Sequence, residues 1–82
     1  MPNNKTIYKV EYSKCVYIFK LLDLLDKSKI SQNKFMRDTK TEYGTLKRYA
    51  TGNIQKVDLI VIDRWCDYLN CTFEDIIEYK KA

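Results

Sequence analysis

The amino-acid sequence predicts an all-α domain of five short helices, preceded by a short N-terminal β-strand. The chain has 82 residues, about the size of one small domain, and 45% of them are hydrophobic, as in globular proteins. Apolar residues recur at helical spacing over most of the chain, and Ser, Asp or Thr stands before most of these runs. Residues 5–12 instead alternate polar and apolar side chains in the manner of a strand.

The first two expected elements lie at the start of the chain. Residues 5–12 predict a short strand, which must pair with another segment or with a second copy, because a lone strand cannot satisfy its backbone. Ser13 is the expected N-cap of a first helix that ends near Lys27. The apolar positions of this helix are Cys15, Ile18, Leu22 and Leu25. This interpretation divides the chain into an N-terminal arm, residues 1–13, and a helical domain, residues 14–82.

Two short helices are expected next. The second helix covers about residues 32–39 with Ser31 as its N-cap, and the third covers about residues 43–51 with Gly52 as its C-terminal stop. Their inward-facing residues are Phe35 and Met36 in the second helix, and Leu46, Tyr49 and Ala50 in the third. Residues 39–42, with the sequence TKTE, also fit a capping box, which would start the third helix earlier.

The last two helices have the clearest start signals. Asp58 is the expected N-cap of the fourth helix, and Val57 and Ile62 are spaced as a hydrophobic staple. The apolar positions of that helix are Leu59, Ile62, Cys66 and Leu69. Thr72 caps the fifth helix, and Asp75 stands at the third helical position as in a capping box. The inward-facing residues of the fifth helix are Ile76 and Ile77.

The composition excludes most enzyme classes. The chain has no histidine, and therefore no imidazole base, nucleophile pair or imidazole metal site, and its two glycines are too few for a phosphate-binding loop. The three cysteines, Cys15, Cys66 and Cys71, lack metal-ligand spacing and are interpreted as reduced core thiols. We expect no enzyme, catalytic residue, metal, cofactor or small-molecule substrate. Apolar runs are far shorter than the roughly 20 residues of a membrane span, so we expect a cytoplasmic protein with no membrane partner.

The charge is unevenly distributed along the chain. The net charge is +4, from 15 Lys and Arg against 11 Asp and Glu. Residues 27–56 carry eight basic and two acidic side chains, a net charge of +6, whereas residues 58–79 carry one basic and six acidic ones, a net charge of −5. Such a split orients a protein over a polyanion, because one end is attracted and the other repelled.

The basic segment coincides with the second and third expected helices. Two short helices joined by a tight turn, the second with exposed polar residues, form the arrangement that places a helix in the major groove of DNA. The first turns of such a helix reach base edges, and the N-terminus of the preceding helix lies against phosphates. Gln32 and Asn33 begin the preceding helix. The outward face of the third helix consists of Tyr43, Gly44, Lys47 and Arg48, with Thr45 at its edge.

Two stretches of the chain resemble a known family. ISQNKFMRDTKTEYGTLKRYATGN, followed by VDLIVIDRWCDYLNCTFEDIIEY, is similar to the Cro/CI-type (XRE) helix-turn-helix DNA-binding domain of small bacterial and phage regulators. The resemblance covers about residues 21–79. It implies a five-helix Cro/CI repressor-like bundle in which the second and third helices read DNA, usually as a dimer on a palindromic operator.

The resemblance also implies which residues contact double-stranded DNA. Gln32 would touch phosphate, residues 43–45 would lie over the bases, and the loop after the third helix would contact phosphates. With the neighbouring basic residues, the expected DNA-binding set is Gln32, Asn33, Lys34, Lys40, Tyr43, Gly44, Thr45, Lys47, Arg48, Asn53 and Lys56. Lys40 stands where the turn of this family usually has Gly, so a left-handed backbone there costs about 1 kcal/mol.

The sequence therefore predicts a sequence-specific DNA-binding transcriptional regulator, expected to be a repressor, that reads the major groove with the helix around residues 43–51. The alternative is a protein-interaction module on the same fold, antitoxin-like or anti-repressor-like. Such a module would use the acidic C-terminal half and an apolar part of the first helix: Val16, Tyr17 and Phe19. We also expect a homodimer formed through the N-terminal strand and the first helix.

Overall fold

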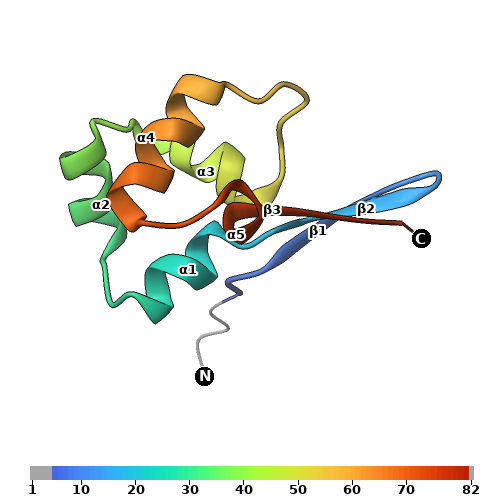
Figure 1. Ribbon diagram of the computed structural model, residues 1–82, viewed down its shortest axis with the longest axis horizontal. Coiled ribbons are helices and arrows are strands. Elements are labelled where there is room, and N and C mark those ends of the chain that lie inside the picture. The colour runs from blue at the N-terminus through green and yellow to red at the C-terminus, as the bar shows by residue number, and fades with distance from the viewer. Residues whose placement is uncertain (1–4, 82) are drawn as a thin grey trace.

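The computed structural model describes residues 5–81, which form five helices and a three-stranded antiparallel sheet (Figure 1). The helices are α1 (Leu21–Lys27), α2 (Gln32–Thr39), α3 (Tyr43–Thr51), α4 (Leu59–Leu69) and α5 (Phe73–Ile76). The strands are β1 (Tyr8–Tyr12), β2 (Cys15–Phe19) and β3 (Ile77–Lys81), in the spatial order β1-β2-β3. In Figure 1 the helices gather at one end, and the β1–β2 hairpin extends away from them beside β3.

Helices form at all five expected places, although the first covers only the end of its expected range, and α2, α4 and α5 begin at the expected caps. The Ser31 side chain accepts a hydrogen bond from the backbone N–H of Lys34 at 3.1 Å, and that of Asp58 accepts one from Ile60 at 3.0 Å. A capping box opens α5, in which the carboxylate of Asp75 accepts from the backbone N–H of Thr72 at 3.0 Å. Local side-chain chemistry therefore fixes where these helices start.

The prediction that the first helix starts at Ser13 is wrong, and the all-α class is confirmed only in part, because a sheet accompanies the five helices. Residues 15–19 form β2, which pairs with β1 through a two-residue turn at Ser13 and Lys14. The segment CVYIF is rich in β-branched and aromatic residues, and its apolar run is continuous rather than helical in period. Neither turn residue has a positive φ, so the turn does not require an Asn-Gly pair. The sequence therefore lacks the signal by which a two-residue hairpin is usually identified.

The C-terminal strand was also missed. The backbone leaves the helix after Ile76, and Ile77, expected on the inward face of α5, begins β3. β3 pairs with β2 so that Phe19 lies opposite Ile77 and Tyr17 opposite Tyr79. The rings of Tyr17 and Tyr79 meet edge to face with centroids 5.4 Å apart. The strand expected at residues 5–12 thus forms at residues 8–12 and pairs with β2 within the chain, and the sheet is completed by the other end of the sequence.

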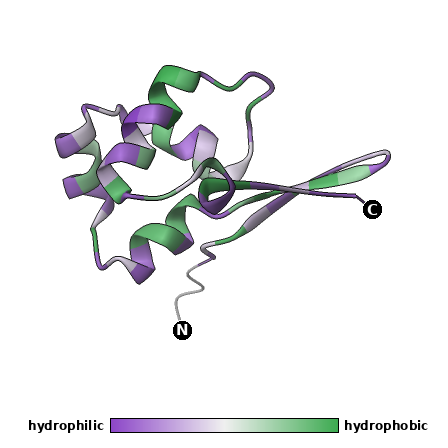
Figure 2. Ribbon diagram, viewed as in Figure 1, coloured by the Kyte–Doolittle hydropathy of each residue, from purple (hydrophilic) through white to green (hydrophobic). Residues whose placement is uncertain are grey.

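One hydrophobic core joins the helices to the sheet. Trp65 is fully buried, with its ring 5.0 Å from that of Tyr49 and 5.5 Å from that of Phe35. The cluster continues through both β-strands and helices: Phe19, Leu21, Leu25, Leu46, Ile62, Ile76 and Ile77. Leu59, expected on the inward face of α4, is 69% exposed instead. Figure 2 shows hydrophobic residues on α1, on β2 and at the start of α4.

Gly52 is the point where α3 meets the hairpin. It ends α3 as expected, with a φ of 82° that favours glycine. A Cβ atom at this position would lie 2.5 Å from Cγ2 of Val10 and 2.8 Å from Cδ1 of Phe19. The missing side chain therefore lets the end of α3 pack directly on the sheet.

Candidate nucleic-acid interface

The turn between α2 and α3 sets the relative orientation of the two helices. α2 ends at Lys40, whose backbone is left-handed with φ 54° and ψ 46°. The strained conformation anticipated at this position is therefore present, although the residue is not glycine. α3 begins at Tyr43 after the extended N-cap Glu42, so the expected capping box over residues 39–42 does not form.

A chain of hydrogen bonds ties this turn to α4. The Thr39 hydroxyl donates to the backbone carbonyl of Phe35 at 2.6 Å and lies 2.7 Å from the hydroxyl of Thr41. Because the Thr39 proton is already used, the Thr41 hydroxyl donates to Thr39, and it accepts from Nε1 of Trp65 at 2.9 Å. Nη1 of Arg64 donates to the carbonyl of Thr39 at 3.1 Å. The turn is thus held by α4, which fixes the orientation of α3 relative to α2.

The outward face of α3 is open to solvent. Leu46, Tyr49 and Ala50 are buried as expected, which leaves the opposite side of the helix uncovered. Tyr43 is 60% exposed, and a Cβ atom at Gly44 would meet no atom within 4 Å. All of the expected DNA-binding residues on the chain are exposed, apart from Thr45, which is half-buried.

The loop after α3 brings further polar groups to the same end of the helix. Residues 48 and 53–56 line a shallow groove of about 390 Å³, which therefore joins Arg48 to Asn53 and Lys56. Ile54 and Gln55 also line this groove and were not among the expected site residues. No spacing or motif in the sequence distinguished them, because the groove depends on how the loop folds back past α3.

The positive charge of Lys34, at the start of α2, is partly neutralised by an ion pair. Nζ of Lys34 lies 2.8 Å from Oδ2 of Asp38, and the Tyr68 hydroxyl donates to the same carboxylate oxygen at 2.5 Å. The hydrogen bond to Asp38 raises the pKa of Lys34, and the hydrogen bonds from Lys34 and Tyr68 lower the pKa of Asp38. Gln32 and Asn33 are exposed beside this ion pair.

The two charged segments occupy different elements. The segment of net charge +6, residues 27–56, contains α2, α3 and the loop that follows, whereas the segment of net charge −5, residues 58–79, contains α4, α5 and the start of β3. The one basic residue of the acidic segment, Arg64, is the residue that binds the carbonyl of Thr39. Positive charge is therefore concentrated on α2, α3 and the loop after α3.

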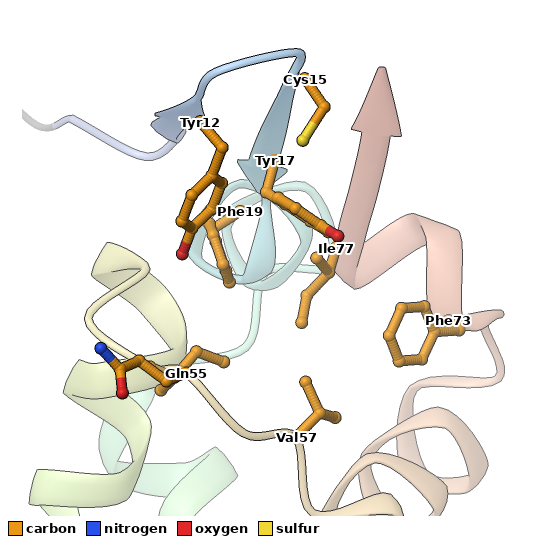
Figure 3. A pocket seen from close by; sticks show the side chains of 9 residues that line it. Tyr12, Cys15, Tyr17, Phe19, Gln55, Val57, Phe73 and Ile77 are labelled. Carbon is orange, nitrogen blue, oxygen red and sulfur yellow. The ribbon is translucent and has the colours of Figure 1, made fainter. Parts of the chain in front are cut away.

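An apolar groove of about 390 Å³ lies between the sheet and the loop before α4. Figure 3 shows aromatic side chains of the sheet on one side of this groove, with Val57 and Phe73 across from them. Its lining residues are Tyr12, Cys15, Tyr17, Phe19, Ile54, Gln55, Val57, Phe73 and Ile77. Of the residues expected to form an exposed apolar surface, Phe19 is buried and Val16 and Tyr17 are half-buried, because they belong to β2.

Cys71 does not lie in a reactive environment. Burial beside Cys66 raises the pKa of the Cys71 thiol to about 12, so this thiol stays protonated and is a poor nucleophile at neutral pH. Among residues 5–81 no group of three His, Cys, Asp or Glu side chains is placed to hold a metal ion. Within the same range, no helix has the length and apolar character that crossing a membrane requires.

Comparison with known proteins agrees with this geometry. A family model described as the Cro/C1-type HTH DNA-binding domain matches residues 20–82, which include every helix and β3 but not the β1–β2 hairpin. No curated protein and no solved structure matches the chain. The matched segment is most of the chain and contains the α2–turn–α3 unit whose outward face is exposed. The chain belongs to the Cro/C1-type HTH DNA-binding domain family.

Proposed function

We propose that the protein is a cytoplasmic transcriptional regulator that binds specific double-stranded DNA sequences and acts as a repressor. The observation that carries this proposal is the exposed outward face of α3, next to the groove that joins Arg48, Asn53 and Lys56. A helix fits the major groove, and Lys or Arg at its end can reach base edges or phosphates. The membership of the family supports DNA as the ligand.

Each part of the interface has a distinct role in this proposal. Tyr43, Gly44 and Thr45, in the first turn of α3, lie over base edges, and Lys47 and Arg48 contact bases or backbone. The remaining residues contact phosphates from the start of α2, the turn and the loop after α3: Gln32, Asn33, Lys34, Lys40, Asn53 and Lys56. The acidic segment keeps the other side of the molecule away from the phosphates. A homodimer would place two copies of α3 in successive major grooves of a palindromic site.

Selection of binding sites from random DNA, followed by titration of variants on the selected site, tests the proposal. We expect Lys47→Ala and Arg48→Ala each to weaken binding by about 1–3 kcal/mol where the side chain reads a base. A variant that loses only a phosphate contact should lower the slope of log affinity against log salt by about 1.

Lys14→Ala is the matched control, because Lys14 is an exposed basic residue in the β1–β2 turn, outside the interface. It should bind like the unmodified chain, and far-UV circular dichroism should be unchanged for all three variants. A selection that enriches no sequence, with equal affinity for all DNA, would contradict sequence-specific regulation.

A second candidate function, the protein-interaction module, is favoured by one observation. The start of α4, which follows Val57 of the apolar groove in the sequence, exposes large hydrophobic side chains, with Ile60 73% and Leu59 69% exposed. Patches of this kind often mark protein interfaces. If this is the function, a stoichiometric protein partner should replace DNA, and Ile60→Asp should abolish its binding while Lys47→Ala leaves it intact. Loss of DNA binding in Lys47→Ala with no effect of Ile60→Asp on any partner would favour the regulator.

A further inference from the structure

The outer edge of β1 is open in the described part of the chain. β1 is the first strand of the order β1-β2-β3 and pairs on one side only. An edge strand presents unpaired backbone groups that can pair with another chain. The sequence of β1, YKVEY, has Tyr at both ends, a valine at its centre, and opposite charges on either side of that valine.

The hairpin geometry determines which residues face the open edge. Tyr12 and Cys15 flank the two-residue turn, so they form a hydrogen-bonded pair, and paired and unpaired positions alternate along an antiparallel ladder. Tyr8, Val10 and Tyr12 therefore direct their backbone groups toward β2. Lys9 and Glu11 direct their backbone N–H and C=O groups outward, where no strand pairs with them.

We propose that β1 pairs antiparallel with β1 of a second copy of this chain, about a two-fold axis at Val10, and so specifies the homodimer of the proposed function. Pairing about Lys9 would place like charges opposite each other, and so would pairing about Glu11. Pairing about Val10 places Lys9 opposite Glu11 of the partner subunit, twice by symmetry. The same register places Tyr8 opposite Tyr12 of the partner subunit and the two Val10 side chains opposite each other.

The side chains of Lys9 and Glu11 are available for this pairing. Both are exposed, and neither takes part in an ion pair within residues 5–81. The other open edge, β3, is less suited, because Glu78 is already paired with Lys20 at 3.1 Å and adjacent lysines follow at its end. Charge complementarity therefore selects β1 and its register together.

This dimer would also suit a ligand with two-fold symmetry. Gly52, at the end of α3, lies against Val10 and Phe19, which places α3 on one face of the sheet. The two-fold axis of an antiparallel pair is perpendicular to the sheet, so both copies of α3 stay on the same face of the joined sheet. Palindromic DNA requires such an arrangement, because both reading helices must approach the duplex from one side.

Charge reversal tests the register by sedimentation equilibrium without DNA. The unmodified chain should sediment as a dimer, whereas Lys9→Glu alone and Glu11→Lys alone should each raise the dissociation constant by about tenfold to a hundredfold, because each creates two like-charge pairs. An equimolar mixture of the two variants should form a heterodimer, since its charges are again complementary. The doubly reversed chain, Lys9→Glu with Glu11→Lys, should form a homodimer for the same reason.

Lys14→Glu, the same charge change in the hairpin turn, is the matched control and should remain dimeric. Far-UV circular dichroism reports whether each variant keeps the fold. A monomeric unmodified chain at millimolar concentration would overturn the proposal, and so would single variants that stay dimeric or a mixture that stays monomeric. A dimer that binds no DNA would instead refute the proposed function alone, and a monomer that binds a half-site would refute the dimer alone.

Discussion

The α2–turn–α3 unit and the β1–β2 hairpin differ in what determines their conformations. In the first, the helix ends depend on residues close by in sequence, because Ser31 caps α2, the left-handed Lys40 ends it, and Gly52 ends α3; only the turn is also held by α4. In the second, β2 is held between β1 and β3, which comes from the opposite end of the chain. The family model covers the first region and leaves out the hairpin.

This difference shows that an element outside the family pattern can still belong to the core. Phe19 of β2 is only 4% exposed and packs in the same cluster as Phe35 of α2. Val10 and Phe19 occupy the space that a side chain at residue 52 would need. The hairpin is therefore an integral layer of this domain, although the family model begins after it, at residue 20.

The largest expected effect comes from removing a hairpin side chain from the core. Phe19→Ala should lower the free energy of unfolding by about 3–5 kcal/mol, as Phe35→Ala should, because both rings are buried and leave a cavity. Urea denaturation of the two variants measures both values. If the hairpin is only an attached arm, Phe19→Ala will cost much less than Phe35→Ala, and the shared core is refuted.

Replacing glycine by alanine should have opposite effects on the free energy of unfolding at the two ends of α3. Gly52→Ala should lower the free energy of unfolding by about 2–4 kcal/mol, from a left-handed backbone and a clash with Val10 and Phe19. Gly44→Ala, in the same helix, should raise it by about 1 kcal/mol, because its Cβ meets open space and alanine favours helix. Urea denaturation compares them, and equal signs would contradict the direct packing of α3 on the hairpin.

The helices could be predicted because their signals are local. Ser31, Asp58 and Thr72 stand at helix starts, and their side chains satisfy backbone N–H groups within the first turn. The buried residues of α3 also follow from the 3.6-residue period. Signals of this kind require no knowledge of the rest of the fold.

The sheet could not be predicted beyond its first strand, for two physical reasons. Cys15, Ile18, Leu22 and Leu25 match a helical period by coincidence, because the chain changes from strand to helix at Lys20. Ile77–Lys81 is a strand only because β2 lies beside it, and a capping box just before it favours a longer helix. Pairing between distant segments has no counterpart in local spacing.

For the candidate site, the exposure of its residues could be predicted from the sequence, but the ion pairs and hydrogen bonds of its charged side chains could not. The exposed face of α3 follows from its period, so Tyr43, Lys47 and Arg48 could be named in advance. The hydrogen bond from Tyr68 to Asp38, the partner of Lys34, could not be assigned from the sequence, because Tyr68 comes from α4. The groove beside Arg48 likewise depends on the path of a loop.

The smallest expected effect comes from removing the negative charge of Asp38 in α2. Asp38 accepts hydrogen bonds from Lys34 and Tyr68, which lower its pKa below the ordinary value of 3.8, whereas the hairpin takes no part in these contacts. A carboxylate of depressed pKa stabilises the fold above its unfolded pKa, and this stabilisation is lost as the pH falls through the folded pKa. Asp38→Asn should therefore lower the urea midpoint at pH 7, and its difference from the unmodified chain should shrink as the pH falls below about 4.

Asp67→Asn provides the control for Asp38→Asn, because Asp67 is exposed on α4 and forms no ion pair within the described residues. Its effect on the midpoint should be small at both pH values. A difference for Asp38→Asn that stays constant from pH 7 to pH 3 would contradict the role of the ionised carboxylate.

The same substitution, Asp38→Asn, removes a negative charge beside Lys34, so DNA affinity at low salt should rise while stability falls. Opposite changes in binding and stability would show that Asp38 holds α2 against α4 at the expense of charge on the proposed DNA-binding face.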